Sequence, residues 1–316
     1  MSCQIKLRTL RQAAPALALA VSLLAGKSAP AQAPAGTVEP VHRVANAAAG
    51  QTQQPTQVAA RIAPTAAAAP AESPFDLTQR PGEHPLMPAL RVAQEQVKQI
   101  DANIQDYSAL LYKQERIDGE LQEQEVAFVK VRHQPFSVHM FFLSPHKGRE
   151  CLYVPGANGE KGILHARDSG FRKKLGVFEL DPDGRLAMAG QKYPITKLGI
   201  RNLTTELVDV ASKDVNYGEC EVRTLQTTIG AANDKRPVTV IEVIHPTPRK
   251  NFRFHKAQVF IDNEHRVPIR YAAYMWPQNP GEEPPLEEAY TYVNLKINNG
   301  FTDADFARSN PELFKN

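Results

Sequence analysis

The sequence predicts an α+β fold, mainly β, in which two amphipathic helices cover the concave side of a strongly curved antiparallel sheet. Alternation of apolar and polar residues, the period of a strand, dominates the last two thirds of the chain. Short turns containing Gly or Asp separate these runs, so successive strands form hairpins. About ten strands in one flat sheet would expose long edges, so we expect strong curvature or partial closure into a barrel.

Residues 1–31 have the features of a secretory signal peptide. The basic residues Lys6 and Arg8 precede an apolar run over 13–26, and Ala29-Pro30-Ala31 fits a small-x-small cleavage site. This apolar run is too short to cross a bilayer comfortably, which takes roughly 20 residues. An uncleaved anchor is the alternative. The segment predicts an exported protein of the periplasm or cell envelope.

Removal of this segment changes the charge balance of the chain. The segment carries four basic residues and no acidic residue, so the formal net charge goes from +3 to −1. Binding of nucleic acid requires basic residues concentrated on one face. The mature chain lacks such an excess of charge, so we expect no nucleic-acid partner.

Residues 32–83 are predicted to be a disordered linker. Ala, Pro, Gln and Thr dominate the segment, and such a composition buries too little apolar surface to offset the entropy of ordering. The single folded domain is then expected to occupy residues 84–316, a size typical of one domain.

Two segments place apolar residues at helical spacing. In the first, Pro85 and Pro88 suit an initial turn, and in the second Gly199 interrupts the pattern. The two apolar stripes are formed by Leu86, Leu90, Ala93, Val97 and Ile100, and by Ile195, Leu198, Leu203, Leu207 and Val210.

Residues 104–154 are predicted to form several successive strands, with a hairpin at Asp118-Gly119. Within them an alternating run puts one apolar set on a single face and Phe141 on the opposite face. We expect the apolar face to form either core or the wall of a hydrophobic ligand site. Its residues are Phe136, Val138, Met140 and Phe142.

The last third of the chain is predicted to be strands at 221–229, 238–245, 256–262, 266–274 and 286–298. A proline-rich loop at 275–285 contains the only tryptophan, Trp276. Outside any strand, this side chain could contact a ligand or partner, or serve as a plug over the sheet edge. After the strands, residues 302–306 are expected to form a short capped helical turn.

The mature chain would keep two cysteines, Cys151 and Cys220. In an oxidising compartment they could form a disulfide. The alternative, equally weighted, is two buried thiols on different strands.

The sequence shows no motif for metal, phosphate or nucleophilic chemistry, so we expect no cofactor, no metal and no enzymatic activity. Two acidic residues, Glu115 and Glu125, flank the Asp118-Gly119 turn beside several basic residues. We interpret them as cross-strand ion pairs on a solvated face.

Several motifs resemble an exported bacterial domain family of unknown function over about residues 84–314. The motifs include Tyr112-Lys-Gln-Glu115, Tyr193-Pro-Ile-Thr196, Pro268-Ile-Arg270-Tyr271 and Glu288-Ala-Tyr290-Thr-Tyr292. In overall plan this family is similar to periplasmic lipoprotein carriers of the LolA/LolB type. The resemblance implies an unclosed half-barrel whose apolar concave face takes up acyl chains, and it names no reaction.

Two functions therefore follow as hypotheses. In the first, the protein binds or carries a lipid or the acyl chains of a lipoprotein in the cell envelope. In the second, it is an envelope scaffold whose core is filled by its own helices and which acts through contact with an envelope protein partner. A large apolar cavity would favour the first hypothesis.

Overall fold

The computed structural model describes residues 73–156, 160–230 and 235–315. The predicted signal segment, the cleavage site and most of the predicted linker lie outside these residues. Residues 73–83, which the sequence assigns to the linker, already contact the domain, because Phe75 and Leu77 pack on its core. Ser73 Oγ also lies 3.2 Å from Thr239 Oγ1. These contacts place the start of the domain earlier than residue 84.

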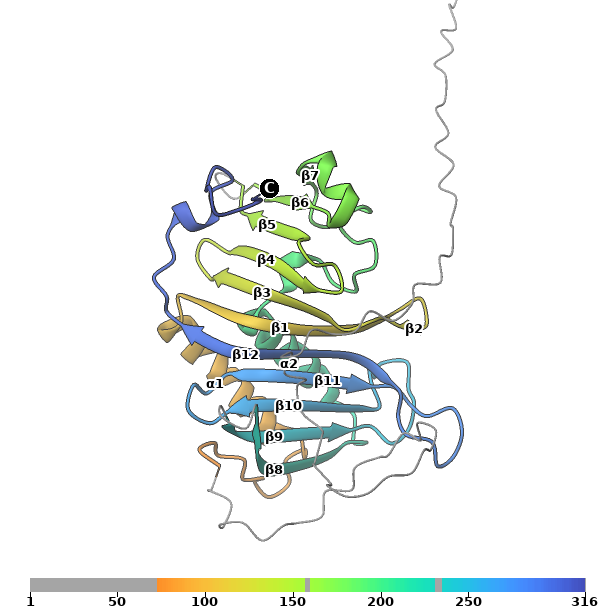
Figure 1. The fold of residues 1–316 in the computed structure, drawn as a ribbon. Helices are drawn as coiled ribbons and strands as arrows, with labels where there is room; N and C mark the ends of the chain where they lie inside the picture. The colour runs from red at the N-terminus through yellow and green to blue at the C-terminus, as the bar shows by residue number, and fades with distance from the viewer. Residues whose placement is uncertain (1–72, 157–159, 231–234, 316) are drawn as a thin grey trace, which may run out of the picture. The chain divides into compact units, whose positions relative to one another are not determined.

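The domain is built on one antiparallel sheet of twelve strands, and Figure 1 shows them stacked in a single curved layer. The order is β7-β6-β5-β4-β3-β1-β12-β11-β10-β9-β8, with β2 paired to β1 alone. Because β7 and β8 are the two free ends of this order, the sheet is open, which confirms the predicted unclosed half-barrel. The strands are β1 (Asp106–Ile117), β2 (Glu120–Leu121), β3 (Glu125–Arg132), β4 (Ser137–Ser144), β5 (Glu150–Val154), β6 (Ile163–Arg167), β7 (Phe178–Leu180), β8 (Glu221–Ile229), β9 (Arg236–Ile244), β10 (Lys256–Asp262), β11 (Pro268–Tyr274) and β12 (Leu286–Ile297).

Turn chemistry explains why most strands pair with their neighbours in sequence. At the β1–β2 turn Asp118 and Gly119 both have positive φ, 51° and 84°, as a tight hairpin turn requires. At the β10–β11 turn the carboxylate of Asp262 accepts the backbone N–H groups of Glu264 and His265. The two halves of the sheet meet where β1 pairs with β12, a contact that joins distant parts of the chain.

Two α-helices cover one face of the sheet, which we call the inner face. They are α1 (Met87–Asn103) and α2 (Ile200–Asp214), and in Figure 1 both lie behind the sheet, towards the half formed by β8–β12. Helix α1 begins with Pro88 in its first turn, as the sequence predicts. Helix α2 begins only after Gly199, because this residue has φ of 116° and cannot continue a helix; the preceding residues form the short η3 (Ile195–Lys197).

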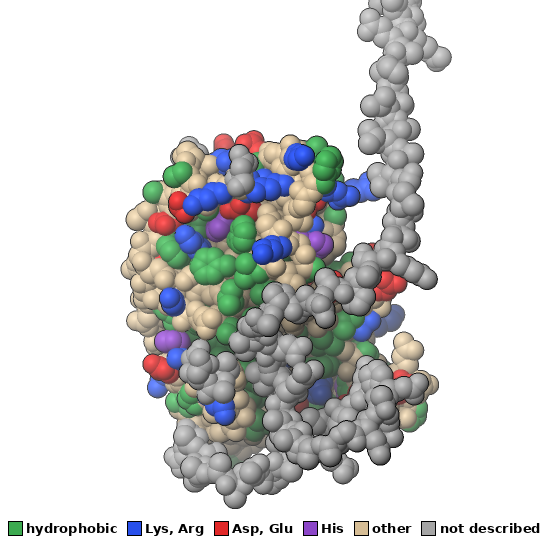
Figure 2. Space-filling model, in the orientation of Figure 1, with side chains coloured by type: hydrophobic (Ala, Val, Ile, Leu, Met, Phe, Trp, Pro, Cys, Tyr) green, Lys and Arg blue, Asp and Glu red, His purple; other side chains and the backbone are tan. Residues whose placement is uncertain are grey.

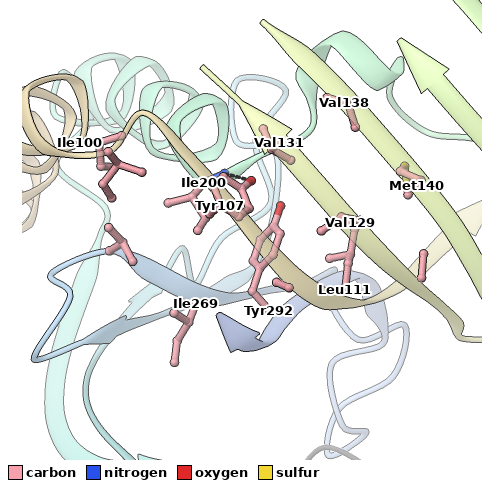
Figure 3. Packing of buried hydrophobic residues seen from close by; sticks show 14 of the residues in the cluster. Ile100, Tyr107, Leu111, Val129, Val131, Val138, Met140, Ile200, Ile269 and Tyr292 are labelled. Carbon is pink, nitrogen blue, oxygen red and sulfur yellow. Dashed lines mark hydrogen bonds between the residues drawn. The ribbon is translucent and has the colours of Figure 1, made fainter. Parts of the chain in front are cut away.

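The inner face carries most of the core. In Figure 3, Tyr107 and Leu111 of β1 and Tyr292 of β12 meet Val129 of β3, and Ile200 closes the cluster from helix α2. A second cluster joins both helices to β9–β11. Burial of an aliphatic or aromatic side chain contributes about 1.5–3 kcal/mol, so these clusters fix the helices on the sheet.

The outer face of β4–β6 is covered by the C-terminal segment 301–315. This segment contains the predicted capped turn, η4 (Asp303–Phe306), with a capping box between Thr302 and Asp305. Phe306 and Phe314 pack on Leu152 of β5. The chain therefore ends as a strap over β4–β6, and this strap buries Leu152 on the outer face.

Candidate functional site

A large cavity lies between the inner face of the sheet and the two helices. Its volume is about 1200 Å³, above the roughly 300–1,000 Å³ of ordinary small-molecule sites. The wall includes residues from β1, β4–β7 and β9–β12, from both α-helices and from the connection 182–199. Most of these side chains are apolar. Representative members are Leu86, Val92, Met140, Phe142, Leu164, Leu180, Leu203, Leu207, Val243, Val259 and Tyr271.

The predicted ligand face of β4 lies in the core cluster, and part of it also borders the cavity. Met140 and Phe142 of β4 line the cavity. Val138, two residues earlier on the same face, is fully buried in the core cluster, and Phe136 packs against that cluster with its ring 5.9 Å from that of Tyr153. The inner face of β4 is thus packed in the core, and Met140 and Phe142 also border the cavity. That a ligand contacts them stays a prediction.

Trp276 is not among the residues described as lining the cavity. Its indole Nε1–H donates a hydrogen bond to the carbonyl oxygen of His245 at 3.0 Å, and its ring lies 5.9 Å from that of His255. These contacts hold the proline-rich loop against the β9–β10 connection. Contact of Trp276 with a ligand stays a prediction.

Lys113 and Glu115 of β1 form the first polar group of the wall, and Glu125 of β3 contacts Lys113 from beside it. Lys113 Nζ lies 2.8 Å from Glu125 Oε2 and 3.4 Å from Glu115 Oε2. The side chains of Lys113 and Glu115 are only 9% and 5% exposed, so the expectation of a solvated face was wrong. Sheet register explains the meeting, because Lys113 stands opposite Glu125 on β3 and opposite Tyr290 on β12. The Tyr290 hydroxyl donates to Glu115 Oε1 at 2.6 Å.

Lys192 organises the second polar group. Its Nζ lies 2.6 Å from Glu287 Oε1 and 3.1 Å from Glu288 Oε2, and the Tyr193 hydroxyl donates to Glu288 Oε1 at 3.3 Å. Adjacent residues of a regular strand point to opposite faces. Here a register shift between β11 and β12 leaves Glu287 as an extra residue, and such a bulge re-aims side chains.

Burial shifts the pKa values of Glu288, Tyr290 and Lys192 in these two polar groups. It raises the pKa of Glu288 although the nearby Lys192 ammonium opposes the shift. Burial and the charges of Glu288 and Glu115 raise the pKa of the Tyr290 phenol strongly, so it stays a neutral donor. Burial alone would lower the pKa of Lys192, but its bonds to Glu287 and Glu288 outweigh that effect and raise it. Lys192 therefore remains charged.

These polar residues could not be assigned from the sequence alone. Lys192 comes from the connection before α2, whereas its partners lie on the last strand, and no local pattern marks the pairing. The backbone N–H of Lys192 also donates to Glu115 Oε2 at 3.1 Å, which joins the two polar groups. The only sequence feature that pointed to the second polar group was the adjacent acidic pair at 287–288.

The two cysteines are free thiols, so the structure agrees with the second of the two alternatives and not with a disulfide. Cys151 lies on β5, and Cys220 immediately precedes β8, the edge strand at the far end of the sheet. Seven strands separate β5 from β8 in the sheet order, whereas a disulfide requires Cα atoms within about 7 Å. Burial raises the pKa of both thiols to about 12. Cys151 lines the cavity.

Within the ranges that the structure describes, no group of His, Cys, Asp and Glu side chains could hold a metal ion. His139 and His165 share the outer face, where Leu152 stands between them. Among the same residues, no helix has both the length and the apolar character needed to span a bilayer.

The chain is similar in structure to several bacterial proteins at low sequence identity. The Mycobacterium tuberculosis lipoprotein LppX shares 14% identity over 68% of this chain and 98% of its own, with a TM-score of 0.38. A DUF1329 family protein from Desulfovibrio piger shares 12% over 72% and 98%, with a TM-score of 0.34. A LolA superfamily protein from Nitrosomonas europaea shares 11% over 68% and 97%, with a TM-score of 0.24.

No curated protein matches the sequence. A family model described as "Protein of unknown function (DUF1571)" matches residues 104–313. This range covers β1 to the C-terminal strap, and thus the whole sheet, helix α2 and most of the cavity wall. It lies within the stretch on which the resemblance to a family of unknown function rests. The chain belongs to the DUF1571 family.

Proposed function

We propose that this protein is an exported, non-enzymatic binding protein that shelters acyl chains of a lipid or a lipoprotein in its cavity. The observation that carries the proposal is the cavity of about 1200 Å³ with its mainly apolar wall. Transfer of one methylene from water to such an environment is favourable by about 0.8 kcal/mol. A long chain therefore gains affinity from its length, without a dedicated polar contact for each part of the ligand.

The charges of the wall support a ligand held mainly by apolar contact. Lys113 is neutralised by Glu125 and Glu115, and Lys192 by Glu287 and Glu288. A ligand that carried its own charge into these groups would have to compete with partners already in place, and an unpaired buried charge is costly. This arrangement favours acyl chains inside the cavity with the polar part of the ligand at the opening.

The competing proposal is an envelope scaffold whose inner face is filled by its own helices. The closed packing around Val138 and Ile200 favours it locally, since both side chains are fully buried. The cavity wall beyond Met140 favours the carrier. Export to the periplasm or envelope rests on the signal-like sequence at 1–31 and belongs to both proposals.

Titration of the full chain with a fluorescent long-chain fatty acid tests the carrier proposal. Ala166 of β6 lines the cavity, so Ala166→Trp fills part of it from one wall. We expect saturable binding by the wild type and at least about tenfold weaker binding by this variant, a loss of about 1.4 kcal/mol.

The matched control is Thr227→Trp, at an exposed position of the edge strand β8. It adds the same indole without entering the cavity, and we expect wild-type affinity. Circular dichroism of all three proteins checks that each is folded. The carrier proposal is contradicted if the wild type binds no fatty acid, or if a folded Ala166→Trp binds as tightly as the control.

A further inference from the structure

The most exposed apolar side chains of the described residues gather at one end of the sheet. Phe171, Leu186, Leu175 and Phe178 are 82%, 76%, 67% and 47% exposed, and every other large apolar side chain described is less exposed. Exposed apolar side chains are normal when scattered, but a concentration of them marks an interaction site. We call these four residues, together with Arg172, Lys173 and Lys174, the rim.

The rim is continuous with the cavity. Leu175, Phe178 and Leu186 are exposed to solvent and also line the cavity wall. Side chains that satisfy both conditions stand at an opening. The rim belongs to β7, the edge strand, and to the segments on either side of it, including the short η2 (Gly170–Leu175). A ligand leaving the cavity at this end would pass between these residues.

Charge at the rim is positive. The turn η2 carries Arg172, Lys173 and Lys174 and no acidic residue. Lys174 Nζ lies 5.2 Å from the centre of the Phe171 ring, so a cation and an aromatic ring are presented together. In Figure 2, apolar side chains lie beside Lys and Arg side chains at the upper right, the place of β7 in Figure 1.

Acidic groups near the rim are largely held by basic partners. Asp181 and Asp183 both contact Lys161 Nζ, at 2.5 and 2.9 Å. Asp168 accepts from Arg149 at 3.1 Å and lies 3.5 Å from Arg172. Glu179 of β7 is 69% exposed and lies 3.7 Å from the ring of His165. Lys161 balances only one of Asp181 and Asp183, and burial lowers the pKa of His165, so this ring leaves Glu179 uncompensated. The positive charge belongs to the turn itself, through Lys173 and Lys174.

We propose that the rim docks the protein onto a lipid bilayer containing anionic lipids, so that the cavity opens against the membrane. Apolar side chains flanked by Lys and Arg are the chemistry that binds at the interface of an anionic membrane. The inference deepens the proposed function, since a carrier of acyl chains must receive or release them at a lipid surface. Binding to membrane does not itself require a filled cavity, so the two can fail separately.

Co-sedimentation of the full chain with vesicles tests the docking. We expect binding to vesicles of equal parts phosphatidylglycerol and phosphatidylcholine, weak binding to phosphatidylcholine alone, and loss at raised salt because the attraction is electrostatic. The double variant Lys173→Gln, Lys174→Gln should bind the anionic vesicles about fivefold more weakly per charge removed. The variant Phe171→Ser, at a side chain that is 82% exposed, should bind both kinds of vesicle more weakly.

Matched controls lie at the opposite edge of the sheet and on a distant loop. Leu225→Ser changes a side chain of β8 that is 42% exposed, and Lys250→Gln removes an exposed charge from the β9–β10 connection. Both should bind vesicles like the wild type. The docking proposal is overturned if the wild type stays in solution with every vesicle, or if the controls lose as much binding as the rim variants.

Two further readouts separate the outcomes. The variants at Phe171, Lys173 and Lys174 should still bind the fluorescent fatty acid in solution, because these three side chains are not among those described as lining the cavity. If the protein binds vesicles but takes up no fatty acid, the carrier proposal is contradicted and the docking proposal stands. If it takes up fatty acid but binds no vesicle, only the docking proposal is contradicted. Dimerisation that depends on the rim in sedimentation without lipid, with no vesicle binding, would instead assign the rim to a second copy of the chain.

Discussion

The phenol oxygen of Tyr107 on β1 accepts a hydrogen bond from the backbone N–H of Ile200, at 3.0 Å, in the first turn of α2. Early N–H groups of a helix have no partner within the helix. The residue before α2 is Gly199, which has no side chain to supply a cap, so a buried tyrosine of the sheet takes that role. The bond ties the helix that walls the cavity to the strand at the centre of the sheet (Figure 3).

Replacement Tyr107→Phe tests this link. It keeps the ring and leaves a buried N–H without its acceptor, which costs about 1–3 kcal/mol. Urea unfolding should show a lower midpoint at an unchanged slope. The control Tyr217→Phe alters a phenol on a side chain that is 41% exposed, and a loss there as large as at Tyr107 would contradict the assigned role.

Replacement Gly199→Ala should destabilise the same junction. Gly199 has φ of 116°, and a Cβ added to it would lie 3.0 Å from the Tyr107 hydroxyl oxygen. Strain of this kind costs about 1–3 kcal/mol. Gly218→Ala is the matched control, because a Cβ there meets nothing within 4 Å. Equal unfolding free energies for the two variants would show that the junction tolerates the side chain.

Glu150 on the outer face makes stability depend on pH. Burial alone would raise the pKa of Glu150, but hydrogen bonds from His139 and from the Phe314 N–H outweigh burial and lower it. A carboxylate with a lowered folded pKa contributes stability that is present above its unfolded pKa of about 4.3 and is lost as pH falls through the folded value. Arg167 also binds this carboxylate, at 3.1 Å.

We expect Glu150→Gln to be less stable than the wild type by about 3–5 kcal/mol near neutral pH, since Arg167 would keep a buried charge with a weaker partner. The difference should shrink as the pH falls from about 4.3 through the lowered pKa of the folded state, below which the wild-type carboxylate is protonated as well. Urea unfolding across this range measures it, with the exposed Glu312→Gln as control. A difference that does not change with pH would contradict the assignment.

Thiol labelling reports on the cavity directly. Thiolate is the reactive form, so a pKa raised to about 12 makes both cysteines slow towards maleimide at neutral pH. Cys151 lines the cavity. Bound acyl chains should slow its labelling further and leave that of Cys220 unchanged, as peptide mass mapping would show. Equal effects on the two thiols would indicate general stabilisation instead.

Local patterns predicted the elements well where their periodicity is regular. The strands at 221–229 and 256–262 have the predicted bounds, because alternation and turn residues fix both ends. The start of α2 differed, because the first half of the predicted stripe, around Ile195, is a 3₁₀ turn ended by the extended backbone at Leu198. The backbone conformation at Leu198 and Gly199, and not the apolar spacing, therefore sets where helix α2 begins.

The site was predicted only in part, for a physical reason. Alternation identified the face of Met140 and Phe142, yet whether a face is core or cavity wall depends on how far the helices extend over it. The pairing of Lys113 with Glu125, and of Lys192 with Glu288, depends on strand register and on a bulge. A shift of register by one residue would turn these side chains to the other face, and single-sequence patterns do not fix register between distant strands.

We propose that the cavity holds acyl chains in the cell. The most direct measurement is native mass spectrometry of the protein purified from its own envelope, followed by extraction into organic solvent. We expect a co-purifying lipid or acylated molecule at close to one per chain, released by extraction. A mass equal to that of the bare polypeptide, unchanged after incubation with lipids, would contradict the claim and favour a scaffold.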